Sequence, residues 1–423
     1  MSAPASEMLS GEQIVCISVH PWDHPFQTSR HHLAAEFARR NTVLFVDPPL
    51  NLISALRRHR TPETRDRLAA WTGRRPALRP VRDGLHVLTP PPILPFGKVR
   101  QRPLFDALLA ANLVPFRAAV RRAAGALGFA RPLLWISFSP LFGRGVLGLL
   151  DERLSLYHCT DETATEPRAP VYSAAIERDL LGRVDLVVCS SEELKRTKGG
   201  FNPFTYTVPN AADVDLFEQA LDPATALPAD LAAIPGPRIG FVGVLDFRVD
   251  QALLAACAAA RPDLQWVLIG PVHGQWFDQA ALARYPNVHF LGLKPRTALP
   301  AYLKGVDVAT IPFVLDRHTR AIYPLKLHEY FAAGRPVAAT PLPALTALAD
   351  GLAGHLHLGA GPAGFLAAID AALAGRDRDI AARVAHARQN AWPGRAADIS
   401  ALIHQRLAAR SPRPAPVLEM SRL

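Results

Sequence analysis

The sequence predicts an α/β protein of two Rossmann-like, doubly wound domains that face each other across a cleft. Apolar strand-like segments alternate with helix-like segments over most of the chain, which is typical of parallel sheets covered by helices on both faces. The 423 residues exceed what one hydrophobic core usually holds, and a proline-rich segment separates two alternating stretches. We therefore expect a first domain at 1–220, a linker at 221–237, a second domain at 238–390, and a C-terminal helix and tail at 391–423.

The first domain is expected to open with a β-α-β unit. A buried strand is predicted at 13–19, a helix at 29–39 with Leu33 and Phe37 on one face, and a second strand at 42–46. Further strands are expected in this domain at 85–88, 132–137, 154–159 and 185–190, with helices at 173–182 and 191–198. The later part is expected to hold strands at 238–243, 265–270, 288–291, 306–311 and 336–339, with helices at 250–260, 298–304, 326–333, 361–373, 377–388 and 396–409. Ligands of such sheets bind at the carboxyl ends of the strands, so the cleft is the predicted active site.

The composition and the ends of the chain indicate a cytoplasmic protein. Residues 1–11 lack the basic start and apolar run of a secretion signal, and the apolar stretches are interrupted before the roughly 20 residues that a bilayer span needs. We therefore expect no membrane crossing. The four cysteines (Cys16, Cys159, Cys189 and Cys257) lie far apart without CxxC spacing, which favours small buried side chains in a reducing compartment over a zinc site.

The net charge of +10 calls for an acidic partner, which could be nucleic acid, a phosphate-bearing substrate or an anionic membrane surface. Much of the excess lies between Arg57 and Arg102, where arginines are mixed with Leu56, Trp71 and Phe96. This mixture suits a lipid surface, because apolar side chains enter the headgroup boundary while arginines pair with phosphates. A solvated, arginine-rich face is the alternative. The first interpretation would place the chain peripherally on the inner face of the plasma membrane.

The most informative segment, YPLKLHEYFAAGRPV, runs from Tyr323 to Val337. Pro324 and Leu325 lead into a helix whose first-turn N–H groups lack intrahelical partners, so an anion such as a diphosphate can bind there. Lys326 would add a positive charge. Glu329 shares a helix face with Lys326 and can accept hydrogen bonds from paired sugar hydroxyl groups. A surface Lys-Glu pair is the alternative if this segment stood alone.

The order of several further segments resembles the GT-B glycosyltransferases, in particular the large retaining family known as glycosyl transferases group 1. The resemblance covers nearly the whole chain. It rests on VPNAADVDLF at 208–217, FVGVLDFR at 241–248, WVLIGP at 266–271, VHFLG at 288–292, LPAYLKGVDV at 299–308, IPF at 311–313 and the segment from Lys326 to Val337. Each segment is weak by itself, but their order and spacing are specific.

The resemblance implies roles for the matching residues. Gly243 and Arg248 would meet the donor phosphates, as would Lys326, and Glu329 would bind the ribose hydroxyl groups. The residues from His289 to Gly292 would lie near the nucleotide base of the donor. Tyr323, Pro324 and Leu325 complete the predicted donor-binding set. The family often has a second glutamate eight positions before the helix glutamate, where this chain has Ala321. The nearby polar residues that could bind the donor sugar in place of that glutamate are Asp316, Arg317, His318 and Tyr323.

Two first-domain segments carry candidates for the catalytic base. One follows the first strand and contains Asp23, His31 and His32, which by spacing match no standard metal motif. The other, YHCTDE at 157–162, is similar to a segment of surface-polysaccharide members of the fold and places Asp161 and Glu162 after a strand. We prefer Asp161 as the base. The alternative is that Thr160 or Asp161 caps a following helix.

Together these features predict a hexosyltransferase-type enzyme without metal or cofactor. The donor would be a UDP- or GDP-sugar and the acceptor a saccharide or a lipid-linked intermediate, in the synthesis of cell-surface polysaccharide or glycolipid. No nucleic-acid partner is expected. The alternatives are a GT-B sugar epimerase and a non-catalytic protein that binds nucleotide sugars.

Overall fold

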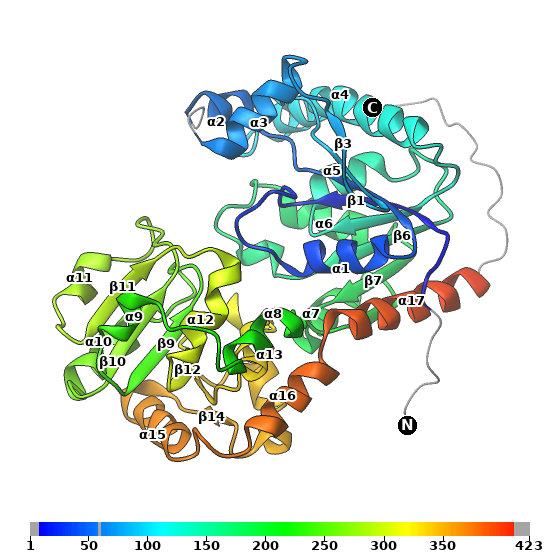
Figure 1. Cartoon of the computed structure of the whole chain (residues 1–423). Helices are drawn as coiled ribbons and strands as arrows, with labels where there is room; N and C mark the ends of the chain where they lie inside the picture. Colours follow the sequence, from blue (N-terminus) through cyan, green and yellow to red (C-terminus); the bar gives the residue numbers. More distant parts are fainter. Residues whose placement is uncertain (1–7, 58–60, 410–423) are drawn as a thin grey trace.

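A computed structural model describes residues 8–57 and 61–409, and within them the chain forms two sheets flanked by helices (Figure 1). The first sheet has the strand order β3-β4-β2-β1-β5-β6-β7-β8, and all its pairs are parallel except β3 with β4. Its strands are β1 Gln13–Ser18, β2 Thr42–Val46, β3 Leu78–Arg82, β4 Leu85–Leu88, β5 Leu133–Ser137, β6 Leu154–Cys159, β7 Leu186–Cys189 and β8 Thr205–Thr207.

The second sheet is parallel throughout, in the order β11-β10-β9-β12-β13-β14. Its strands are β9 Arg238–Val242, β10 Gln265–Ile269, β11 Val288–Gly292, β12 Val308–Ile311, β13 Val337–Ala339 and β14 Leu356–Leu358. The predicted α/β fold with two parallel, helix-covered sheets is thereby confirmed. The four cysteines are buried and free, as small apolar side chains.

Helices cover both faces of the first sheet because alternate strand residues enter different cores. Ile14 and Cys16 pack towards α1, whereas Val15 and Ile17 pack with Phe116 of α4. The helices of the first domain are α1 Ser29–Ala38, α2 Leu52–Arg57, α3 Pro62–Trp71, α4 Arg102–Ala126, α5 Pro140–Val146, α6 Ser173–Leu181, α7 Glu192–Lys198 and α8 Val214–Phe217.

The segment expected to be a linker is packed onto the second domain. It contains α9 Ala229–Ala232, and Leu231 and Ile234 are buried in the second core. The remaining helices are α10 Gln251–Ala260, α11 Gln279–Ala283, α12 Leu299–Lys304, α13 Lys326–Ala332, α14 Pro343–Thr346, α15 Gly361–Ala374, α16 Ile380–Gln389 and α17 Trp392–Ala408.

The last helix, α17, returns to the first domain (Figure 1). Trp392 stacks on His32 with ring centroids 5.0 Å apart, and Ser400 Oγ accepts a hydrogen bond from the N–H of Leu9. The C-terminal helix therefore completes the core beside α1, where Ala396, Ile399 and Ile403 are buried.

Helix α4 is an element that the sequence analysis did not predict, because Pro103 and Pro115 interrupt the pattern. Pro103 lies in the first turn, where its missing N–H costs no hydrogen bond, and Pro115 lies on the exposed side. Among the described residues α4 is also the one helix whose length and composition would suffice to cross a bilayer, with 33% of its most apolar window buried.

Candidate active site between the two sheets

The two domains touch where strands of both sheets end. Ser191, just after β7, donates from Oγ to the carbonyl of Ala321 at 2.6 Å. Asn210 donates from Nδ2 to the carbonyl of Tyr323 at 2.8 Å. Thr165 Oγ1 lies 3.0 Å from His318 Nδ1. The loops after β6, β7 and β8 therefore lie against the segment between β12 and α13.

Two glycines at the ends of β9 and β10 leave space in this site. A Cβ on Gly270, with φ +144°, would lie 1.9 Å from the carbonyl oxygen of Gly243. A Cβ on Gly243, with φ +154°, would lie 2.6 Å from Lys326 Nζ. Both conformations favour glycine. The ammonium group of Lys326 thus occupies the space that a side chain at position 243 would take.

Lys326 brings a positive charge to this site. Within the described residues no carboxylate oxygen lies within 4.0 Å of Nζ, which instead lies 5.5 Å from the ring centroid of Phe241. Burial lowers the pKa of Lys326; Glu329 raises it, and the guanidinium of Arg248 lowers it again. Asp246, the ion-pair partner of Arg248, also raises this pKa. The two basic groups that we predict for the donor phosphates, Lys326 and Arg248, therefore lie within electrostatic reach of each other.

Arg248 is held in place by the fully buried Asp246. Its Nε lies 2.9 Å from Oδ1 and its Nη2 lies 2.8 Å from Oδ2, a two-pronged geometry that fixes the plane of the guanidinium. The third nitrogen, Nη1, has no hydrogen bond within the part of the chain that the structure describes. Asp246 therefore orients Arg248 and leaves it a donor for a ligand.

Glu329 lies one turn along α13 from Lys326 and is partly buried. Burial raises the pKa of Glu329, Lys326 and Arg296 lower it, and Asp213 raises it. Its carboxylate has no hydrogen-bond donor among the described residues. A carboxylate in this condition can accept hydrogen bonds from two neighbouring hydroxyl groups of a ligand.

Asp161 follows β6 and faces the second domain. Burial raises the pKa of this carboxyl group; His318, Arg248 and Arg30 lower it, and Glu166 raises it. His318 and Arg248 belong to the second domain, so Asp161 lies in the same interdomain space as the predicted phosphate-binding arginine. The hydroxyl of Thr160 donates to Asp161 Oδ2 at 3.3 Å and accepts from Arg30 Nη2 at 3.2 Å.

The neighbouring Glu162 is neutralised inside the first domain. Lys198 Nζ lies 2.8 Å from Glu162 Oε1 and 2.9 Å from Glu177 Oε2, and all three side chains are nearly inaccessible. Glu162 also caps the short helix Thr163–Thr165 by accepting from the N–H of Ala164. Glu162 therefore has the capping role that the sequence left open for Thr160 or Asp161. The carboxylate of Asp161 does not cap this helix.

The candidates that follow β1, namely Asp23 in the loop and His31 and His32 in α1, form contacts within the protein. His31 accepts at Nδ1 from the N–H of Thr28, and its Nε2 lies 2.9 Å from the carbonyl of Pro21. Both ring nitrogens are therefore engaged, and this geometry does not support a proton transfer by His31. Asp23 forms an ion pair with Arg79 of β3. His32 stacks on Trp392, and its Nε2 lies 3.4 Å from Arg296 Nη2.

The residues before α13 shape the site mainly through the backbone. The hydroxyl of Tyr323 lies 2.9 Å from His328 Nε2 in the protein interior, so it is engaged within the second domain. Leu325 is the N-cap residue, and its carbonyl accepts from the N–H groups of His328 and Glu329. The carbonyl of Pro324 accepts from the N–H of Leu327 at 3.3 Å. Ala321 is buried and brings no carboxylate to the donor side.

The structure adds residues that sequence reasoning missed. Arg30 lies in α1, only 2% exposed, and reaches the end of β6, which no local pattern indicates. A ring cluster also lies at the interdomain space, since Phe247 contacts both Trp276 and His318 at centroid distances of 5.6 and 5.1 Å. From the first domain, Arg168 lies 5.7 Å from the Trp276 ring. The sequence feature that could have indicated this cluster is Trp276, a half-buried tryptophan in the segment that follows β10.

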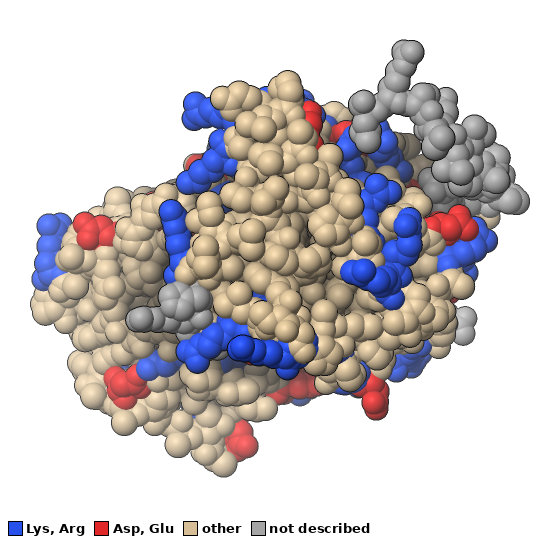
Figure 2. All heavy atoms as spheres, turned by 90° about the horizontal axis from the view of Figure 1, so that it is seen from above, with Lys and Arg blue, Asp and Glu red and all other residues tan. Residues whose placement is uncertain are grey.

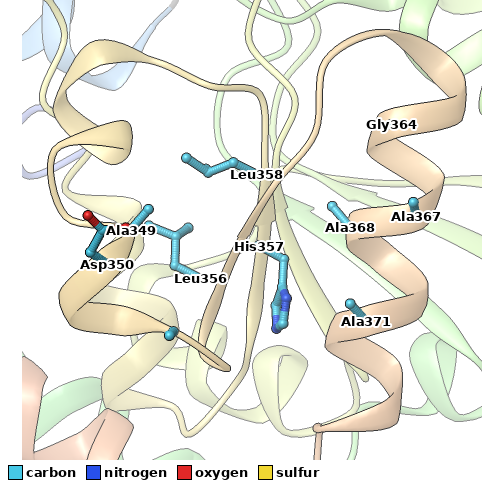
Figure 3. Close-up of a pocket in the computed structure, with 10 residues that line it drawn as sticks. Ala349, Asp350, Leu356, His357, Leu358, Gly364, Ala367, Ala368 and Ala371 are labelled. Carbon is cyan, nitrogen blue, oxygen red and sulfur yellow. The ribbon is translucent and has the colours of Figure 1, made fainter.

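A separate hollow lies beside the edge strand β14 (Figure 3). It includes none of the predicted site residues and is lined by Gly364, Ala367, Ala368 and Ala371 of α15 and by Ala349, Asp350, Ala353, Leu356, His357 and Leu358. Across the described residues no group of three or more His, Cys, Asp or Glu side chains is arranged to hold a metal ion. The interdomain space therefore remains the place where charged groups converge.

Comparisons with known proteins agree with this architecture. Residues 236–375 match the family model described as Glycosyl transferases group 1. The chain is 29% identical over 238 residues to TuaH of Bacillus subtilis, a protein to which a glycosyltransferase role in teichuronic acid biosynthesis is ascribed. That match covers 52% of this chain and 58% of the relative, so it spans little more than half of that protein's length.

Solved structures match nearly the full chain. Sucrose-phosphate synthase from Thermosynechococcus elongatus superposes with a TM-score of 0.66 at 18% identity, covering 94% of this chain and 100% of the other. Anabaena HepE in complex with UDP and glucose gives 0.61 at 15% identity, covering 93% and 100%. WaaG, a glycosyltransferase involved in lipopolysaccharide biosynthesis, gives 0.56 at 13% identity, covering 91% and 99%. The chain therefore has the GT-B fold, and residues 236–375 in its second domain are similar to the group 1 glycosyltransferases.

Proposed function

We propose that this chain is a glycosyltransferase that moves a sugar from a nucleoside-diphosphate donor to an acceptor hydroxyl group. The observation that carries the proposal is that Lys326, beside Gly243 and without a carboxylate within 4.0 Å among the described residues, interacts electrostatically with Arg248, whose Nη1 has no hydrogen bond there. A diphosphate binds both of these groups. Charge-assisted hydrogen bonds of this kind contribute about 1.5–3 kcal/mol each.

The geometry supports a division of tasks between the domains. The bond between the sugar and the diphosphate breaks, and the diphosphate leaves with the electron pair. Lys326 and Arg248 stabilise the negative charge that develops on it, which lowers the barrier. Glu329 accepts hydrogen bonds from the ribose hydroxyl groups. The acceptor oxygen forms the new bond to the sugar, and its proton passes to Asp161 across the interdomain space.

The comparisons support a choice of substrate classes. HepE binds UDP and UDP-glucose in its solved complexes, TuaH is described for teichuronic acid biosynthesis, and WaaG is involved in lipopolysaccharide biosynthesis. We therefore propose a UDP- or GDP-sugar as donor and a saccharide or lipid-linked intermediate as acceptor, in the synthesis of a cell-surface polysaccharide or glycolipid.

One observation favours a second candidate, a protein that binds nucleotide sugars without turnover. At position 321, where the resemblance leads one to expect a glutamate, the chain has a buried alanine whose carbonyl is bound by Ser191. No carboxylate at that position can hold the donor sugar.

A donor panel separates the two candidates. Purified protein is screened by thermal shift against UDP- and GDP-sugars, since a ligand at 100 times its dissociation constant adds about 2.7 kcal/mol of stability. Release of the nucleoside diphosphate is then measured with saccharide and lipid-linked acceptors. A stabilising donor that releases its diphosphate supports the enzyme. Stabilisation without release under any acceptor supports the binding protein, and no stabilisation by any nucleotide sugar contradicts both.

A further inference from the structure

Six exposed apolar side chains gather on one side of the first domain. These side chains, here called the apolar patch, are 42–74% exposed and comprise Leu52, Ile53 and Leu56 of α2, Leu94, and Leu104 and Val114 of α4. Hydrogen bonds join their elements into one surface. The N–H of Leu52 donates to the carbonyl of Ile93, and the N–H of Leu94 donates to Asn112 Oδ1 of α4 at 2.7 Å.

The same surface carries an excess of positive charge. Residues 91–126 contain six Lys or Arg and one Asp, a net +5 that is half of the chain's +10. Arg102 pairs with that Asp106, and within the described residues no ion pair involves the exposed side chains of Lys98, Arg100, Arg117, Arg121 or Arg122. Figure 2 views the molecule from the side where Figure 1 places α2, α3 and α4, and shows a broad uncharged area with Lys and Arg around it.

Helix α4 is long enough to cross a bilayer but is built as a surface helix. Phe105, Leu109, Phe116 and Val120 are buried on its inner face, in the cores that it shares with the sheet and with α5 and α6. Crossing a bilayer would remove these side chains from their cores. Its outer face exposes Leu104 and Val114 in the first part and Arg117, Arg121 and Arg122 in the second.

We propose that the apolar patch and its surrounding cations dock the first domain onto an anionic lipid bilayer. Apolar side chains enter the headgroup boundary while the arginines meet lipid phosphates, which is a partner that matches both the shape and the charge of this surface. The position also suits access to the cleft, because α2 follows the carboxyl end of β2, on the side of the sheet where β6 leads to Asp161 (Figure 1).

Binding to vesicles tests this docking without reference to activity. The full chain is sedimented with vesicles of phosphatidylcholine alone and with vesicles that contain phosphatidylglycerol, at low and high salt. We expect binding to the anionic vesicles that weakens at high salt. Replacing Arg117, Arg121 and Arg122 by Gln should lower the partition coefficient about 100-fold, since each basic residue near such a surface contributes about fivefold. The double variant Leu104→Gln/Val114→Gln should lower it about tenfold.

Matched variants keep the test specific. Replacing three exposed arginines elsewhere, Arg284, Arg378 and Arg388, by Gln removes the same charge and should leave binding near that of the unmodified chain. Equal binding to neutral and anionic vesicles, or equal loss in both triple variants, would overturn the proposal. Retention on the vesicles after alkaline carbonate extraction would also overturn it in favour of a spanning helix. A concentration-dependent dimer in light scattering that the Leu104/Val114 variant abolishes, without vesicle binding, would assign the patch to a second copy of the chain.

Discussion

Arg30 and Asp161 share one hydroxyl group, that of Thr160, which accepts from the guanidinium and donates to the carboxylate. The other partners of Arg30 are Ser137, Thr28 and His20, all of them neutral. The positive charge of this buried arginine therefore acts on Asp161. Arg30 is a positioning residue for the proposed base, because it fixes Thr160 and favours the ionised form of the carboxyl group.

We expect Arg30→Gln to move the acid limb of the pH profile of kcat/KM to higher pH. Burial raises the pKa of Asp161, and Arg30, with His318 and Arg248, opposes this effect while Glu166 adds to it. The base must be ionised, so activity is lost as pH falls through its pKa. Without Arg30 that pKa rises further and activity disappears at a higher pH. Arg30→Lys should restore part of the shift, and a profile that merely scales down would mean a structural role alone.

Asp161→Asn should lower turnover by about 10²–10⁴-fold, the usual range for a general base, while donor affinity measured by calorimetry stays near that of the unmodified chain. His31→Ala and His32→Ala should lower turnover less, since these rings contact Pro21, Thr28 and Trp392. If binding and turnover fall together in Asp161→Asn, the residue supports the cleft and is not the base.

Lys326→Ala and Glu329→Ala should each abolish or severely reduce transfer without unfolding the chain, because neither side chain has an ion pair to lose within the described residues. We expect the loss in donor affinity for both variants and a further loss in turnover for Lys326→Ala, whose charge faces the leaving diphosphate. Turnover and melting curves are measured together. If both variants turn over as fast as the unmodified chain, the donor-site assignment is contradicted.

Gly243→Ala should impair donor binding more than folding. The added Cβ would meet Lys326 Nζ at 2.6 Å, and the end of a lysine side chain can move aside, at the cost of its position. The backbone at φ +154° adds strain of about 1–3 kcal/mol. Gly270→Ala is the contrasting variant, since its Cβ would lie 1.9 Å from a backbone oxygen and should destabilise the fold strongly. Equal melting temperatures for the two variants would contradict this distinction.

Lys198→Met should lower the free energy of unfolding by about 3–5 kcal/mol, because it leaves the buried carboxylates of Glu162 and Glu177 without their cation. Lys195→Met, on the same helix, removes an exposed pair with Glu192 and should cost at most about 1 kcal/mol. Urea unfolding of the two variants measures the difference, and similar midpoints would show that Lys198 has no such role.

The sequence by itself determined the fold class and most strands of both sheets, and it predicts the donor-side residues around Lys326. These depend on local patterns: apolar runs that fill one strand, and a motif within fifteen consecutive positions from Tyr323 to Val337. It also indicated Asp161 and an arginine-rich surface, without deciding what each does. Helix α4 was not predicted because Pro103 and Pro115 interrupt the helical pattern of its sequence, although the folded helix accommodates both prolines.

The tertiary structure decided which charges meet. Asp246 fixes Arg248, Lys198 neutralises Glu162 across 36 positions, and Arg30 reaches Thr160 across 130 positions. The ring nitrogens of His31 contact Thr28 and Pro21 in the preceding loop, which spacing alone did not indicate. Such contacts depend on how strands are ordered in the sheet and how the two domains approach. A linear pattern records the residue types, but only the folded chain brings one charge next to another or keeps them apart.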